Sequence, residues 1–248
     1  MRNMQMTWEH ELPGTPEQVW DAITVHSDGW LWPIAYEPRE GGAESGLTSA
    51  GGRVTAWEPE RRFRTRADGA DGWFNELGYE LEPSAGGTRA RYLHHTVTRP
   101  DEDHDVQERA CRLHTAFYAH SLAQYVQHFA GRTATYVALD APEPSAQAGG
   151  FARLERALGL DADAAVGQRV QLRPAGLPPL DAVVDYRTDA FLGLRTDDAL
   201  IRVYGRDAFG WPVGVALHLF APDADGPALE QAWRAWLDGV FTTEGSVA

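Results

Sequence analysis

Residues 113–129 read LHTAFYAHSLAQYVQHF and form the second part of a stretch, beginning near Asp105, with the spacing of one long helix. When residues are placed at about 100° intervals, the apolar side chains fall on a single arc. This arc comprises Cys111, Tyr118, Leu122, Tyr125, Val126 and Phe129. Gly131 follows as a natural C-terminal stop. The stretch therefore predicts a long helix that covers an apolar surface along one side.

Histidines and a serine interrupt this apolar pattern. His114 and Ser121 lie on the border of the arc, whereas His120 lies on the far side of the helix and His128 lies between the two sides. We therefore expect His120 and His128 to face solvent. His114 and Ser121 are expected to flank the face that meets a sheet.

The segments before the helix alternate with a period of two, which is typical of strands with one buried and one wet face. Residues 61–67 place Phe63 and Thr65 between arginines, and residues 73–82 alternate with glutamates. The buried face of the second segment is expected to carry Trp73, Leu77, Tyr79 and Leu81. The arginine and glutamate stripes are expected to pair across strands on the wet side. Residues 88–98 predict the next strand.

The chain opens with a strand and a short helix. Residues 6–13 are strand-like and end at a Pro-Gly turn. Thr15, Pro16 and Gln18 then provide an N-cap, a first-turn proline and the third residue of a capping box. Residues 41–52 (GGAESGLTSAGG) are rich in glycine and are predicted to form a loop.

A similar order of elements begins again after Arg132. A strand, a helix at 151–159, four strand candidates and a closing amphipathic helix at 227–241 follow in turn. The match lies in element order rather than in residue identity. We therefore predict two units, 1–132 and 133–248, of which the second is smaller.

Charge and cysteine content exclude several classes of function. The formal net charge is −14, from 36 acidic and 22 basic residues, whereas nucleic acids and anionic membranes require a concentrated positive field. Cys111 is the only cysteine, so an intrachain disulfide is impossible and a reducing compartment is favoured. The N-terminus lacks the apolar core of a signal peptide, and no apolar run is long enough to span a bilayer. We expect a cytoplasmic protein that binds neither nucleic acid nor membrane.

Four segments, taken in order, resemble a known fold. They are GTPEQVWDAIT with the tryptophan pair of DGWLWP, GGRVTAWEPERRFRTR, NELGYELEPSAGGTRARYLHH, and the helix ending in LAQYVQHF. Together they resemble the helix-grip fold of the START (SRPBCC) superfamily, and within it the proteins similar to the activator of the 90-kDa heat-shock protein ATPase. The resemblance covers roughly residues 5–130. It implies an α+β fold in which an antiparallel sheet wraps a long C-terminal helix, followed here by a second, smaller helix-grip-like unit.

The resemblance also implies an apolar cavity between the sheet and the helix, where a small hydrophobic or aromatic molecule binds. Two alternatives stay open, because fold alone does not choose a function. One is a polyketide-cyclase-type enzyme with a cavity histidine as general acid or base, and the other is a chaperone-regulating interaction protein. The chain lacks the Asn-Asn-Trp-His-Trp motif of the eukaryotic co-chaperone, which argues against a heat-shock protein partner. A homodimer also stays open.

The candidate site residues lie on the expected inner faces of the strands and the helix. The ligand-binding candidates are Trp73, Leu77, Tyr79, Tyr92, His94, His114, Tyr118, Ser121, Leu122 and Tyr125. His94 and His114 are also the catalytic candidates, with a hydrogen-bonded core histidine as the alternative for each. The tyrosine hydroxyls suit an aromatic ligand, with ordinary core packing as the alternative. The pair at His94 and His95, with His104, lacks the spacing of a metal site, so we expect neither metal nor cofactor.

Overall fold

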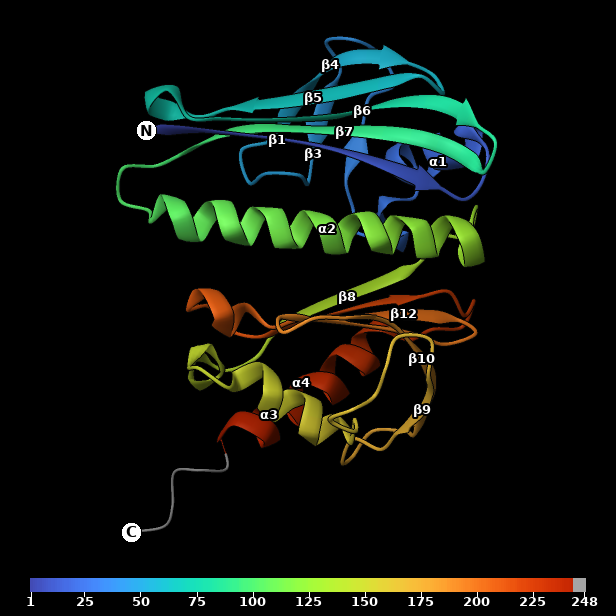
Figure 1. The fold of residues 1–248 in the computed structure, drawn as a ribbon, viewed down its shortest axis with the longest axis vertical. Helices are drawn as coiled ribbons and strands as arrows, with labels where there is room; N and C mark the ends of the chain where they lie inside the picture. The colour runs from blue at the N-terminus through green and yellow to red at the C-terminus, as the bar shows by residue number, and fades with distance from the viewer. Residues whose placement is uncertain (243–248) are drawn as a thin grey trace. The chain divides into compact units, whose positions relative to one another are not determined.

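The computed structural model describes residues 1–242, which form two compact units divided between Thr133 and Ala134. Each unit consists of an antiparallel sheet and a closing C-terminal helix (Figure 1). The prediction of an α+β helix-grip fold with a second unit of the same kind is therefore confirmed. Within the described residues, none of the helices has both the length and the apolar character needed to cross a membrane.

The first unit contains seven strands and two α-helices. In chain order these are β1 (Arg2–Leu12), α1 (Pro16–Thr24), β2 (Ala35–Tyr36), β3 (Ala43–Ser45), β4 (Gly52–Glu58), β5 (Arg62–Asp68), β6 (Phe74–Ser84), β7 (Gly87–Thr98) and α2 (His104–Phe129). The sheet order is β1-β7-β6-β5-β4-β3-β2. The first and last strands of the unit are therefore neighbours, and α2 runs along the sheet beside them (Figure 1).

Local sequence signals explain where α1 begins and show where one prediction fails. The Thr15 side chain accepts a hydrogen bond from the Gln18 backbone N–H at 3.3 Å, and the Gln18 side chain accepts one from the Thr15 N–H at 2.9 Å, so the capping box is confirmed. The loop predicted over residues 41–52 is wrong in part, because β3 lies inside it. Its glycines permit close strand contact: a Cβ added to Gly52 would lie 2.5 Å from a Glu44 carboxyl oxygen.

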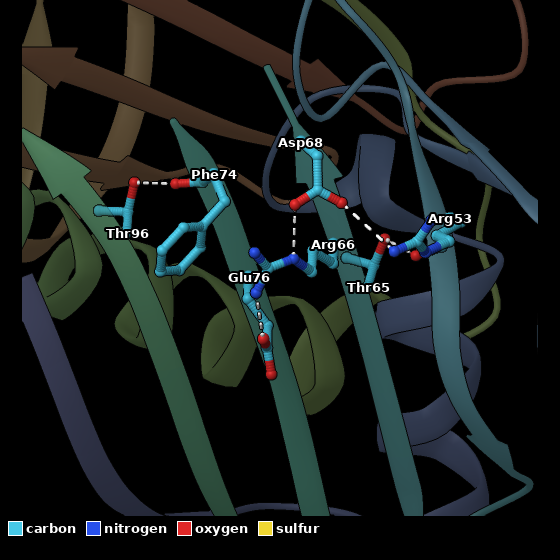
Figure 2. Close-up of polar contacts among 7 residues, drawn as sticks. All are labelled: Arg53, Thr65, Arg66, Asp68, Phe74, Glu76 and Thr96. Atoms are coloured by element: carbon cyan, nitrogen blue, oxygen red, sulfur yellow. Dashed lines mark hydrogen bonds and ion pairs between the residues drawn. The ribbon is translucent and has the colours of Figure 1, made fainter. Parts of the chain in front are cut away.

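The outer face of the first sheet carries the ion pairs predicted from the charge stripes. Arg66 donates to Asp68 at 2.8 Å and to Glu76 at 3.2 Å, and Arg53 reaches the other Asp68 oxygen at 3.3 Å (Figure 2). These side chains are partly exposed, so each pair contributes only roughly 0–1 kcal/mol. Their importance is that they place the charged side chains of these strands on the outer face and leave the inner face for the core.

The inner face is crossed by a row of aromatic side chains at one level of the strand register. The row consists of successive cross-strand partners on five strands, Trp8, Tyr92, Tyr79, Phe63 and Trp57. Ring centroids are 6.2 Å apart for Trp8 and Tyr92, 5.0 Å for Tyr92 and Tyr79, and 5.9 Å for Phe63 and Trp57. Aromatic pairs of this kind are worth roughly 0.5–1.5 kcal/mol beyond their buried area. The row is therefore a main stabilising feature of the surface that α2 covers.

The second unit repeats this connectivity with one strand fewer. In chain order its elements are β8 (Thr135–Asp140), α3 (Gly150–Leu158), β9 (Arg169–Leu172), β10 (Leu180–Arg187), β11 (Phe191–Arg195), β12 (Ala199–Tyr204), β13 (Gly214–Leu219) and α4 (Gly226–Thr242). The sheet order β8-β13-β12-β11-β10-β9 again places the first strand beside the last. Its core lies between the sheet and the two helices, with Leu154, Leu158, Trp233 and Trp236 contributed by the helices.

Gly78 on β6 provides a test of the outer-face packing. It lies opposite Arg64 in the register, and a Cβ added there would stand 2.3 Å from the Phe63 carbonyl oxygen and 2.6 Å from Arg64 Cγ. We expect Gly78→Ala to lower the free energy of unfolding by roughly 1–3 kcal/mol through overpacking, as measured by urea denaturation. Gly86→Ala is the matched control, because a Cβ at Gly86 meets nothing within 4 Å. Equal effects of the two substitutions would contradict the packing described here.

Candidate functional site

A cavity of about 50 Å³ lies inside the first unit, between the inner face of the sheet and α2. Its sheet wall includes Leu77, Tyr79, Ala90 and Tyr92, which alternate inward along β6 and β7. A space of this size has room for a few water molecules. The cavity thus occupies the place that the helix-grip arrangement predicts, but it is small.

The helix wall of the cavity comes from one face of α2. Thr115, Tyr118, Ala119 and Leu122 line the space, and their spacing of three and four residues places them on the same side of the helix. The Tyr118 ring packs edge-on against Trp32 with centroids 5.7 Å apart. This face agrees with the apolar arc predicted for Tyr118 and Leu122.

The segment between α1 and β4 closes the remaining side. The Trp30 indole lines the cavity and donates to the Ala22 carbonyl at 2.8 Å. Tyr36, on β2, lines the cavity with its ring 4.7 Å from that of Phe63. Leu47 is held in place because its N–H donates to the Glu44 carboxyl at 2.8 Å. These contacts make the closing segment part of the folded wall.

Glu44 is a buried carboxyl group beside this wall. It is only 3% exposed, and its register partner on β2 is the cavity residue Tyr36. Burial raises the pKa of the Glu44 carboxyl, while the hydrogen bond from Leu47 acts in the opposite direction. The raised pKa favours the neutral acid more than it would for an exposed glutamate.

The cavity contains polar groups without protein partners. Within residues 1–242, no protein group hydrogen-bonds the hydroxyls of Tyr36, Tyr79 or Tyr92, and His10 Nε2 is buried without a partner. Burial raises the pKa values of all three tyrosines and lowers the pKa of His10, so all four groups are neutral near pH 7. Because buried polar groups are normally hydrogen-bonded, these are the groups most available to a ligand.

Five of the ten predicted ligand-binding residues line the cavity together, namely Leu77, Tyr79, Tyr92, Tyr118 and Leu122. Three others have different surroundings. Trp73 precedes β6 and lies beneath the Arg99 guanidinium at 5.3 Å. Ser121 donates to the Phe117 carbonyl at 2.9 Å, and the Tyr125 hydroxyl donates to the Arg132 carbonyl at 2.9 Å. These three side chains are outside the lining, and their contacts with neighbouring protein groups account for their positions.

His94 faces inward but belongs to a separate polar cluster. Its Nε2–H donates to Asn75 Oδ1 at 2.7 Å, which leaves Nδ1 to accept from the Cys111 thiol at 3.2 Å. Burial, reinforced by His95, lowers the pKa of His94 to about 4, and burial raises the pKa of Cys111 to about 12. A thiol, an imidazole and an amide in this order can form a nucleophilic triad. Here, however, the thiol stays protonated, and only the thiolate is nucleophilic.

The other helix histidines are placed as follows. His114 Nδ1–H donates to the Ala110 carbonyl at 2.8 Å, and the residue is outside the cavity lining. His120, which is expected to face solvent, is half-buried on α2. His128 is exposed, as predicted.

The predicted absence of a metal site concerned His94, His95 and His104. In the structure His104 Nδ1 hydrogen-bonds Thr98 Oγ1 at 2.8 Å, away from the contacts of His94. No group of three or more metal-ligating side chains occurs in the part of the chain that the structure describes.

His10 is one of the cavity residues that sequence reasoning missed, although a signal for it was present. Its strand alternates Trp8, His10 and Leu12 on the inner face with Glu9 and Glu11 on the outer face. This period-two pattern was sufficient to place the imidazole inside. Tyr36 and Trp30 lacked such a signal, because the segment between α1 and β4 holds only very short strands, and β2, which carries Tyr36, has two residues.

Comparison with known proteins gives similarities to solved structures only. No protein-family model matches the chain, and no curated protein matches it. DynU16, a protein in the dynemicin biosynthetic locus, is 14% identical over 96% of both chains, with a TM-score of 0.42. CalU16 from Micromonospora echinospora is 19% identical over 50% of this chain and 74% of its own, with a TM-score of 0.39. Protein MLL2253 from Mesorhizobium loti is 18% identical over 51% and 98%, with a TM-score of 0.44. Similarities at this level do not define a function for the chain.

The buried state of His94 predicts a pH dependence of stability. Folding lowers its pKa from 6.5 to about 4, so the unfolded chain binds a proton that the native protein does not between these values. Stability should therefore fall as the pH drops from about 6.5 to about 4, by about 3 kcal/mol in total from this residue. We therefore expect the free energy of unfolding, measured by urea denaturation, to fall less between pH 7 and pH 4 in His94→Gln than in the wild type. Parallel pH dependences of the wild type and the variant would contradict the assignment, because the opposite effect of Glu44 is common to both.

The protonated thiol of Cys111 predicts slow alkylation. With a pKa of about 12, the thiolate fraction at pH 8 is roughly one in 10,000, far below that of an ordinary thiol. Native protein should react with iodoacetamide at least about 100-fold more slowly than the same chain in concentrated urea, as followed by mass spectrometry. Similar rates in the two states would mean that the thiol is accessible and ionised.

Proposed function

We propose that the first unit binds a small hydrophobic or aromatic molecule in the cavity between α2 and the sheet. The observation that carries the proposal is the combination of apolar walls with unpaired hydrogen-bonding groups, His10 Nε2 and the hydroxyls of Tyr36, Tyr79 and Tyr92. Binding sites for small molecules characteristically combine an apolar lining with a few polar groups that orient the ligand. A core selected only for stability would pair or remove these groups.

The cavity must enlarge to hold such a molecule. Its volume is about 50 Å³, whereas sites for drug-sized ligands measure roughly 300–1,000 Å³. Tyr118 and Trp32, which pack edge-on at 5.7 Å, lie at the border between α2 and the closing segment. Rotation of interface side chains is common on binding, and movement of this pair would extend the cavity toward the segment that contains Leu47.

The cyclase alternative has less support from the two histidines on which it was based. Both ring nitrogens of His94 form hydrogen bonds with protein groups, and His114 Nδ1–H donates to a backbone carbonyl. Neither histidine belongs to the cavity lining. A general acid or base must reach the proton that it transfers. The chaperone-regulating alternative has no specific observation in its favour, so ligand binding is the function we propose.

Binding of an apolar fluorescent probe tests the proposal. We expect N-phenyl-1-naphthylamine to bind the wild-type protein in a fluorescence titration. Tyr118→Ala should tighten binding about tenfold, a change of about 1.4 kcal/mol, because the probe no longer has to displace the phenol ring. Gln127→Ala, at an exposed position on the same helix, is the control and should have no effect.

Native mass spectrometry of protein purified from its own host provides a second readout, in which we expect a retained small molecule. Absence of both probe binding and a retained molecule would overturn the proposed function. Equal responses of Tyr118→Ala and Gln127→Ala would show that the probe binds elsewhere.

A further inference from the structure

His10 has an unusual combination of place and contacts. It lies on β1 opposite Ala90 of β7. The neighbouring pair on the same face of the sheet consists of Trp8 and Tyr92. The imidazole therefore projects from the inner face, where Tyr92 is its diagonal neighbour in the register. Among the residues that the structure describes, it is the histidine that lines the cavity.

The atom of His10 on which the inference depends is Nε2. It is buried and has no hydrogen-bond partner in the described part of the chain. Removing an imidazole nitrogen from water without replacing its hydrogen bond is unfavourable. His10 therefore retains an unmet requirement for one hydrogen bond, which a molecule can supply once the cavity has enlarged, as the proposed function requires, and exposed this buried atom.

The charge of the site limits what that molecule can be. No arginine, aspartate or glutamate belongs to the cavity lining within residues 1–242. Burial lowers the pKa of His10 and raises the pKa of Tyr92, so the two polar groups at this end are neutral near pH 7. An anionic or cationic ligand group would be desolvated here without a counter-ion, which is strongly unfavourable. The ligand group is therefore uncharged.

The hydrogen-bonding capacity of His10 and the tyrosines indicates which uncharged group of the ligand fits best. A neutral imidazole has one nitrogen that donates and one that accepts, and a phenol hydroxyl does both. A hydroxyl on the ligand satisfies Nε2 in either tautomer and can also pair with a neighbouring tyrosine hydroxyl. A carbonyl oxygen only accepts, so it satisfies Nε2 in one tautomer alone.

We propose that His10 is the residue that recognises the ligand, and that it selects an uncharged apolar molecule carrying a hydroxyl group, such as a phenol, at the β1 end of the cavity. This inference rests on the proposed function, because it requires a molecule in the cavity. It assigns to His10 the specificity that His94 and His114, with their protein contacts, do not supply.

A matched pair of ligands tests this assignment. 2-Naphthol and 2-methylnaphthalene are close in size and differ in the hydroxyl group, and each can be titrated against bound N-phenyl-1-naphthylamine at pH 7. We expect the wild-type protein to bind 2-naphthol at least about tenfold more tightly than 2-methylnaphthalene. His10→Phe should reduce this ratio to about one while both compounds still bind, and His10→Gln should retain part of the preference because an amide donates and accepts.

Glu9→Gln is the control on the same strand, since Glu9 faces the outer side, and it should keep the full ratio. A ratio near one in the wild type, or an unchanged ratio in His10→Phe, would overturn the role of His10 and leave it as a residue that binds water. Should His10→Phe fail to fold, the wild-type ratio and the His10→Gln variant still decide the matter. Failure of both naphthalenes to bind is a different result, which overturns the cavity proposal itself.

Discussion

The register between β1 and β7 is the constraint on which the first unit depends. The two strands pair over their whole length, from Arg2 opposite Thr98 to Leu12 opposite Thr88. Because side chains alternate between faces, a slip of one residue would exchange the two faces completely. The observed register places Glu11 where it pairs with Arg89 at 3.2 Å on the outer side. Burial on the inner face and ion pairing on the outer face therefore favour the same register. Agreement of this kind between separate local interactions is what makes a sequence specify one fold.

This alignment also divides the interior polar groups into two sets. Toward the beginning of α2, His94 meets Asn75 and Cys111, and each group has a partner. Toward the end of β1 and the middle of β7, His10 and Tyr92 line the cavity, and His10 Nε2 has no protein partner in the described residues. The first set is complete without a ligand and specifies how helix and sheet dock. The second set is incomplete, and for that reason we propose that the ligand binds there.

Much of the fold could be predicted from sequence because its signals are local. Period-two alternation found the long strands, and the residues around Thr15 predicted the start of α1. The site was predicted less well, because helical spacing gives the direction of a side chain and not its partner. Ser121 lies near the predicted inner face, yet it bonds to the preceding turn of its own helix. Tyr36 and Trp30 close the cavity from the segment between α1 and β4, whose strands are too short for a periodicity that would indicate which side chains turn inward.

The repeated connectivity of the two units has a consequence for how the chain is organised. In the second unit the position between sheet and closing helix is filled by the indoles of Trp233 and Trp236 and by leucines from α3. In the first unit the equivalent position holds tyrosines, a histidine and a void. Buried aromatic and leucine side chains thus occupy this position in the second unit, whereas the first unit keeps a cavity of about 50 Å³ there. Since a filled interior is the more stable arrangement, the cavity of the first unit carries a cost in stability that the packed position in the second unit does not.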